Sequence, residues 1–134
     1  QREVLLAKEL ELPLTIQEQN KLEALKSKCE SQLEFLGRMW KEWDINIISG
    51  TDAIQIFGDY CLGLELMSQA GMSNLDVIRA STSVAAKSIG AGNIFGSIEK
   101  GKGADLIIVD HDPIADIRAL RSMTMVMRAG EQIL

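Results

Sequence analysis

The chain has few of the residues that build metal sites and disulfide scaffolds. Its 134 residues include one histidine and two cysteines, and the cysteines lie far apart in the sequence. A catalytic zinc site usually takes three protein ligands, mostly His, Cys or carboxylate, so we expect no complete site of that kind in this chain alone. Cys29 and Cys61 fall in helical patterns, and we expect both to be reduced thiols.

The sequence also lacks a long apolar run and an excess of positive charge. No stretch reaches the roughly 18 apolar residues that a membrane-spanning helix needs, so we expect no membrane insertion. With 14 basic and 19 acidic residues the net charge is −5, which gives no electrostatic footprint for nucleic acid. The chain starts at Gln1 without an initiating Met or a signal-peptide pattern, and we expect a cleaved or truncated cytoplasmic polypeptide.

A long helix with one apolar face is the clearest element of the first third. Thr15 and Glu18 have the spacing of a capping box. An apolar stripe follows at steps of three and four residues, formed by Leu22, Leu25, Cys29, Leu33, Leu36, Trp40 and Trp43. The stripe suits the outer helix of a barrel or a coiled coil of about three heptads. We favour the barrel helix, because a strand pattern follows it. Residues 1–12 predict a shorter helix that runs into Pro13.

The segment after this helix predicts a strand and then another helix. The near-continuous isoleucines of residues 44–49 are typical of a strand buried on both faces, as in a parallel sheet. A helix is expected over residues 59–69, with Gly71 as its C-terminal cap. A long helix that leads into a buried strand is the repeating unit of a barrel or doubly wound fold.

Two further short helices are predicted before the chain changes character. Ser73, with Asp76 three residues later, is expected to start a helix that runs through residue 80. Thr82 or Ser83 is expected to cap a shorter helix that ends at Gly90.

Beyond residue 90, glycines separate short apolar runs, which indicates strands and hairpins. We expect three strands, over residues 104–109, 123–128 and 132–134. Ala129 and Gly130 form the turn before the last strand, and His111 is interpreted as a solvent-facing turn residue. We therefore predict an α/β part over residues 1–90 and a small β part over residues 91–134.

Six motifs resemble, in order and spacing, the C-terminal third of a metal-dependent amidohydrolase. They are Gly50-Thr51-Asp52-Ala53, Glu65-Leu66-Met67 with Ala70-Gly71-Met72-Ser73, Ala80-Ser81-Thr82-Ser83-Val84-Ala85-Ala86-Lys87, Gly96-Ser97-Ile98-Glu99 with Gly101-Lys102, Ala104-Asp105-Leu106-Ile107-Ile108-Val109-Asp110, and Asp112-Pro113-Ile114-Ala115-Asp116-Ile117. Each motif alone is weak, and together they are specific. The pattern is most similar to the prolidase-like and imidazolonepropionase-like branch of that family.

The resemblance implies a fold class larger than this chain. A complete (β/α)8 barrel needs roughly 250 residues, so the resemblance implies the C-terminal portion of one. The implied fold is α/β: the last β/α portion of an amidohydrolase barrel, plus the C-terminal strands of a small β-sandwich domain. On this reading residues 1–90 are the C-terminal segment of the hydrolase barrel, and residues 91–134 are part of a composite β-sandwich.

The resemblance also implies a function and a site residue. Asp52 occupies the position of the aspartate that ends the last barrel strand, binds or faces the metal, and acts as general base. The implied cofactor is a divalent metal, zinc by preference, which lowers the pKa of a bound water to about 7. The implied reaction is hydrolysis of C–N bonds in a small-molecule substrate such as an amide, a cyclic amide or a dipeptide. We expect the 134-residue chain alone to bind no metal tightly and to be inactive.

Two alternatives remain open from the sequence. Asp52 can instead cap the loop or helix that follows it, without any chemical role. The whole chain can be a non-catalytic, truncated relative that serves as an assembly or interaction module. The length of the native open reading frame separates these functions, since a chain of about 400 residues with an early His-x-His pair favours the enzyme.

The first testable prediction concerns self-association. In the family the small β domain also takes strands from the N-terminus of the same enzyme, so the sheet in this chain should have an open edge, and open edges pair with other chains. We expect dimers or larger assemblies when light scattering is measured over a concentration series. A clean monomer at every concentration would contradict the prediction.

Overall fold

The computed structural model of the chain describes residues 13–43, 45–51 and 59–134. The chain divides into two compact units, residues 1–35 and residues 36–134. The helix expected over residues 1–12 lies outside the described residues. No helix in the described part of the chain is long and apolar enough to cross a membrane.

The first described element is the helix α2, Ile16–Glu42. Its start confirms the predicted capping box: the Glu18 N–H donates to Thr15 Oγ1 at 3.3 Å, and the Thr15 N–H donates to Glu18 Oε2 at 2.8 Å. The predicted stripe is only partly buried, because Leu22, Leu25 and Leu33 are half-exposed and Cys29 is exposed.

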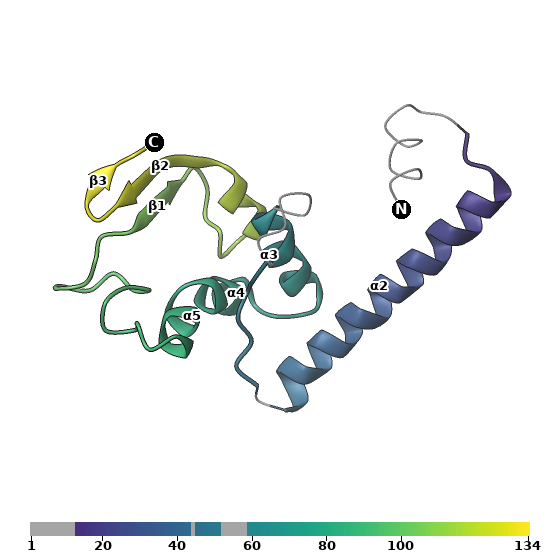
Figure 1. The fold of residues 1–134 in the computed structure, drawn as a ribbon, viewed down its shortest axis with the longest axis horizontal. Helices are drawn as coiled ribbons and strands as arrows, with labels where there is room; N and C mark the ends of the chain where they lie inside the picture. The colour runs from purple at the N-terminus through teal and green to yellow at the C-terminus, as the bar shows by residue number, and fades with distance from the viewer. Residues whose placement is uncertain (1–12, 44, 52–58) are drawn as a thin grey trace. The chain divides into compact units, whose positions relative to one another are not determined.

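The second unit begins in the last turns of α2 and continues into α3, Tyr60–Gln69 (Figure 1). Asp59 caps α3 by accepting the Leu62 N–H at 3.1 Å. Gly71 ends it with a positive φ of 99°, and its N–H donates to Ser68 O at 2.9 Å. The helix predicted over residues 59–69 and its glycine cap are therefore confirmed.

Two short helices follow, α4 (Asn74–Ser81) and α5 (Ser83–Ser88). Ser73 caps α4 as predicted, since its side chain accepts the Asp76 N–H at 3.2 Å. Thr82 stands at the N-cap of α5 but makes no side-chain cap bond; its Oγ1 donates backwards to Ile78 O at 2.6 Å. A side-chain cap by Thr82 was thus the wrong expectation, because the hydroxyl is already bonded to the preceding helix.

A small core lies where α3, α4 and the 3₁₀ helix η1, Ile117–Arg121, meet. Its buried members are Leu64, Met67, Met72, Val77, Ala80 and Ile117. Leu36 and Trp40 from the end of α2 pack against this cluster together with Ile47. Asp116, which caps η1 by accepting the Arg118 N–H, begins an element that the sequence analysis did not predict.

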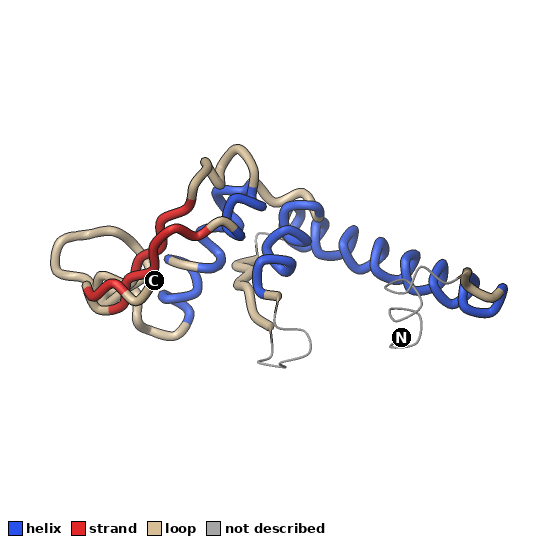
Figure 2. Tube along the Cα trace, turned by 90° about the horizontal axis from the view of Figure 1, so that it is seen from above, coloured by secondary structure: helices blue, strands red, loops and turns tan. Residues whose placement is uncertain are grey.

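The C-terminal residues form a three-stranded antiparallel meander in the order β1-β2-β3 (red in Figure 2). The strands are β1 (Leu106–Val109), β2 (Met123–Arg128) and β3 (Glu131–Gln132). The predicted turn is confirmed, with positive φ at Ala129 and Gly130. The last strand is shorter than expected, although Ile133 and Leu134 still bond Val126 through the backbone. The outer edge of β1 has no ladder partner among the described residues.

The strand predicted over residues 44–49 is not observed. Residues 45–50 have no regular secondary structure, and Asp44 lies outside the described residues. The Ser49 N–H of this segment donates to Ala80 O of α4 at 3.4 Å, which is a bond to a helix. A strand is defined by its ladder to a neighbouring strand, and no such neighbour lies beside this segment in the described part of the chain.

The domain boundary near residue 90 stays a prediction. The second compact unit, residues 36–134, runs across that position.

A close approach between α2 and the end of α3 generates a prediction about stability. A Cβ at Gly37 would stand 2.2 Å from the Ala70 carbonyl oxygen. We therefore expect Gly37→Ala to destabilise the protein by about 1–3 kcal/mol, the usual cost of overpacking. Urea unfolding followed by circular dichroism measures this free energy.

Gly63→Ala is the matched control. Gly63 lies inside α3, and a Cβ there would meet nothing within 4 Å. Alanine is about 1 kcal/mol better than glycine inside a helix, so this variant should be more stable. Equal changes of the same sign in both variants would contradict the packing argument.

Candidate functional site

The site residue predicted from the sequence, Asp52, lies outside the described residues, as do residues 53–58. The structure describes what flanks them: Ser49, Gly50 and Thr51 on one side, and Asp59 with Tyr60 on the other. The candidate site is therefore built from these flanking residues and from the elements that hold them.

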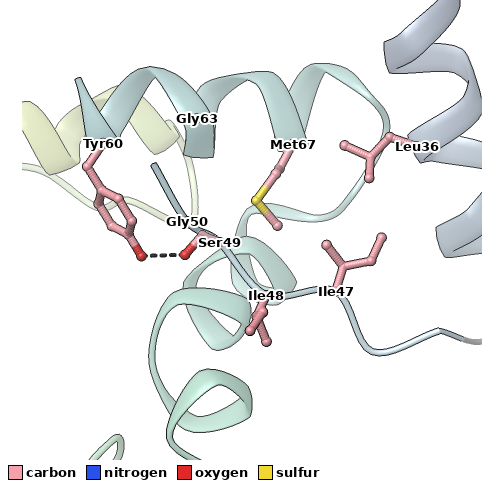
Figure 3. Close-up of a pocket in the computed structure, with 8 residues that line it drawn as sticks. All are labelled: Leu36, Ile47, Ile48, Ser49, Gly50, Tyr60, Gly63 and Met67. Atoms are coloured by element: carbon pink, nitrogen blue, oxygen red, sulfur yellow. Dashed lines mark hydrogen bonds between the residues drawn. The ribbon is translucent and has the colours of Figure 1, made fainter. Parts of the chain in front are cut away.

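A hollow of about 190 Å³ lies beside the segment that precedes Asp52 (Figure 3). It is lined by Leu36, Ile47, Ile48, Ser49, Gly50, Tyr60, Gly63 and Met67. The lining is apolar at one end, where Leu36, Ile47 and Met67 lie, and carries two hydroxyl groups at the other. Among the described residues no charged side chain lines it, so these residues offer packing space there and no acid or base.

The two hydroxyls of the hollow belong to Ser49 and Tyr60, and they are hydrogen-bonded to each other (dashed in Figure 3). Tyr60 is the first residue of α3, and Ser49 also donates its N–H to Ala80 O in α4. The segment before Asp52 is thus bonded to both helices. This gives the backbone at Ser49 a defined place although it belongs to no strand.

An ion-pair cluster holds the other flank. Arg121 Nη1 lies 2.8 Å from Asp59 Oδ2, and its Nε donates to Glu65 Oε1. The Arg121 guanidinium holds the pKa of the Asp59 carboxyl below its usual range, and the Leu62 N–H adds to this effect. Hydrogen bonds to Glu65 and Asp59 in turn raise the pKa of Arg121.

Sequence reasoning missed this cluster. Arg121 lies 56 residues from Glu65, and no local pattern links such distant positions. The available signal was the presence of Asp59 and Glu65 on one predicted helix, and this does not identify Arg121 as their partner.

Several polar groups elsewhere in the described part of the chain have structural roles. His111 is exposed in the turn after β1, as predicted. Ser81 Oγ donates to Ile78 O at 2.9 Å, so that hydroxyl is used within its own helix. Lys102 Nζ bonds Ser97 Oγ at 2.6 Å and Glu99 Oε1 at 3.1 Å, which closes the turn that contains Gly101. None of these groups reaches the hollow.

The described residues do not fit a metal ion by themselves. No group of three or more His, Cys, Asp or Glu within residues 13–43, 45–51 and 59–134 is arranged to hold one. The side-chain donor set of the described flanks consists of the hydroxyls of Ser49, Thr51 and Tyr60 and the Asp59 carboxylate, which is already paired with Arg121. Any hydrolytic chemistry at this place would therefore need groups beyond the described residues.

The second unit thus combines the helices α3 to α5 with a C-terminal antiparallel meander. The amidohydrolase family matches residues 4–133. The chain belongs to the amidohydrolase family. No curated protein sequence gives a significant match.

Solved structures agree with this assignment. A Xaa-Pro dipeptidase, solved with methionine in its active site, is 33% identical over 75% of this chain, with a TM-score of 0.69. A protein described as a prolidase from Bifidobacterium longum is 34% identical over 72%, with a TM-score of 0.67. Ochratoxinase of A. niger is 27% identical over 97%, with a TM-score of 0.67.

The chain spans only part of these relatives. It covers 25% of the dipeptidase chain, 25% of the Bifidobacterium protein and 29% of ochratoxinase. The comparisons therefore establish the family and a partial α/β fold.

The hydroxyl pair generates a prediction. Tyr60→Phe removes one hydroxyl and keeps the ring, so we expect a loss of about 1 kcal/mol, the net value of one hydrogen bond. The loss should disappear when Tyr60→Phe is made in a Ser49→Ala background, because the bond is already absent there. Urea unfolding of the four proteins in this double-mutant cycle measures the coupling, and equal losses in both backgrounds would exclude the bond.

Proposed function

We propose that the chain is the C-terminal part of an amidohydrolase that hydrolyses a C–N bond in a small molecule, with Asp52 as its catalytic carboxylate. The observation that supports this proposal is the family match over residues 4–133, a range that includes Gly50-Thr51-Asp52-Ala53. Dipeptides and cyclic or acyl amides are the substrate class, because two of the similar structures are a Xaa-Pro dipeptidase and a protein described as a prolidase.

The proposed chemistry of Asp52 is proton transfer. Hydrolysis adds a water oxygen to the carbonyl carbon and breaks the C–N bond, so one proton leaves the water and one must reach the departing nitrogen. A carboxylate within hydrogen-bond reach of both atoms performs the two transfers in turn. Asp59 is less suited to this task, because its carboxylate already accepts from Arg121 and Leu62.

A divalent metal, zinc by preference, is the cofactor that the family implies, and Asp52 is the one ligand proposed from this chain. The described residues supply no further ligand set. The other ligands must come from outside them.

The finer architecture is part of the same proposal. The last barrel strand, which the resemblance assigns to residues 44–49, would need a neighbouring strand from outside the described residues, and that strand would also cover the exposed side chains of Ile45 and Ile48. Residues 1–90 would belong to the barrel and residues 91–134 to a composite β-sandwich.

One observation favours a second function, assembly without catalysis. Ile107 and Ile108 of β1 are each 49% exposed on a strand whose outer edge has no ladder partner in the described part. Such an edge pairs readily with another chain. A non-catalytic relative would assemble through this surface of β1, and Asp52 would then have no catalytic role.

The test compares Asp52→Asn with Asp110→Asn in the native gene product, whatever its length, on a panel of acyl dipeptides and cyclic amides. Asp110 is an exposed carboxylate that follows an apolar run, as Asp52 does, and lies in the β part. We expect Asp52→Asn to lower kcat by about 10²- to 10⁴-fold, the usual contribution of a general acid or base. Asp110→Asn should leave kcat unchanged.

The 134-residue chain is assayed in parallel, with elemental analysis for bound metal. We expect no stoichiometric metal and no turnover from it. Full activity of Asp52→Asn in an active native protein would refute the catalytic role. A native protein without hydrolytic activity would favour the assembly function.

A further inference from the structure

The connection between β1 and β2 leaves the sheet and returns to it. It comprises residues 110–122, contains η1, and directly follows the last residue of β1. Its two ends are bonded to each other, because the Asp110 N–H donates to Ser122 O at 3.1 Å. A surface loop of roughly 6–16 residues whose ends lie together is an Ω-loop, and such loops are frequently functional. We call residues 110–122 the strap.

The strap has hydrogen bonds of its own. Asp112 accepts the Asp116 N–H at its carbonyl oxygen and the Ile114 N–H at its carboxylate, at 3.1 Å and 2.8 Å. Asp116 in turn accepts the Arg118 N–H at 3.0 Å, at the start of η1. Each of these bonds joins two residues of the strap, so none of them has to break when the strap moves away from the helices.

The strap lies on α3 and α4. Ile117 is 6% exposed and belongs to the core cluster together with Leu64 of α3 and Val77 of α4. Asn74, in the first turn of α4, donates its side-chain N–H to Ile114 O at 3.0 Å. A buried side chain and a hydrogen bond thus hold the middle of the strap against the two helices.

Arg121 attaches the end of the strap to α3. It is the last residue of η1; its Nη1 lies 2.8 Å from Asp59 Oδ2, and its Nε donates to Glu65 Oε1. One guanidinium serves both carboxylates because its planar fork presents several N–H donors in fixed directions. Arg121 and Asp59 are 41% and 46% exposed, so water and salt reach this attachment.

A thiol faces the same end of the strap. Cys61 of α3 is half-buried, and its Sγ donates to Leu120 O, next to Arg121, at 3.7 Å. The access of a reagent to Cys61 should therefore depend on where the strap lies. Cys29 is exposed on α2, so the chain carries both a reporter thiol and a reference thiol.

We propose that the strap opens from α3 and α4 as one unit while the helices and the meander stay folded, and that Arg121 is the latch that holds it closed. Contiguous segments with few buried contacts open in this way ahead of global unfolding. Opening gives up the burial of Ile117 and the contacts of Asn74 and Arg121, and it keeps the hydrogen bonds inside the strap. The motion does not involve Asp52, so it stands apart from the proposed function.

The experiment is thiol labelling of the folded 134-residue chain with N-ethylmaleimide, an uncharged reagent, with the rate at each cysteine measured by peptide mass spectrometry. In the wild type Cys61 should react more slowly than Cys29. Arg121→Met should raise the Cys61 rate by about 2- to 30-fold, as expected when an opening equilibrium loses two partly exposed ion pairs. The Cys29 rate should not change.

Arg118→Met is the matched control. Arg118 lies on the same 3₁₀ helix, is 73% exposed and pairs with Asp116 inside the strap at 2.8 Å. Arg118→Met and Arg121→Met remove the same charge from the same element, and only the second removes an ion pair to α3. Arg118→Met should therefore leave the Cys61 rate as in the wild type. An Arg121→Met protein with an unchanged Cys61 rate would overturn the proposal.

A second measurement distinguishes opening of the strap from unfolding of the whole chain. The urea dependence of a transition scales with the surface that it exposes, and opening the strap exposes much less surface than unfolding. Labelling of Cys61 at low urea should thus accelerate less steeply than hydrogen exchange of the Val77 amide in α4 and the Val126 amide in β2, which bond Ser73 O and Leu134 O. Equal urea dependences would mean that the thiol is reached only through global unfolding, and the proposal would fail.

If Arg121→Met does not fold, the wild type is labelled at about 0.1 M and about 1 M salt, between which the screening length falls from about 10 Å to about 3 Å. The ratio of the Cys61 rate to the Cys29 rate should rise, because screening weakens the ion pairs of Arg121. An unchanged ratio would refute the role of Arg121 as the latch.

Discussion

The packing of α3 against α4 and η1 is the constraint on which the second unit depends. Val77 is completely buried at this junction, and Leu64 and Ile117 are nearly so. Each neighbouring segment is held by this small cluster: Ile47 packs on it before the Asp52 segment, and η1 carries the chain on into β2. Burial of apolar surface is non-directional and does not fix how two segments are aligned. The hydrogen bond from Ser49 to Ala80 and the ion pair between Arg121 and Asp59 fix the positions of specific atoms.

The elements that could be predicted from the sequence are those fixed by nearby residues. Helix α2 begins at its predicted capping box, and α4 begins at Ser73, because such caps lie within three residues of what they bond. The strand expected over residues 44–49 was wrong for the opposite reason, since strand pairing needs a distant neighbour. Thr82 failed as a side-chain cap because its hydroxyl had two possible partners, and the choice depends on the geometry between α4 and α5.

For the candidate site, too, the sequence predicts some features and misses others. Asp52 could be proposed only from the resemblance, because a lone carboxylate after an apolar run is equally typical of a loop cap. The tertiary contacts of the residues that flank it could not be predicted. Tyr60 meets Ser49 across eleven positions, and Arg121 meets Asp59 across sixty-two, and each contact depends on the packing of α3. The resemblance thus predicts a position for the chemistry, and the structure describes the residues that flank this position.

Several isoleucines are exposed and could be covered by another polypeptide segment. Ile45, Ile48, Ile107 and Ile108 are between 37% and 49% exposed, and Ile98 is 87% exposed. Removing such apolar surface from water is favourable by about 25 cal/mol per Å². A polypeptide segment that covers these isoleucines would therefore stabilise the protein, whether it is covalently joined or belongs to a separate chain. A joined segment covers the surface at any dilution, whereas a second copy does so only above its dissociation constant. Concentration dependence is the property that separates the two cases.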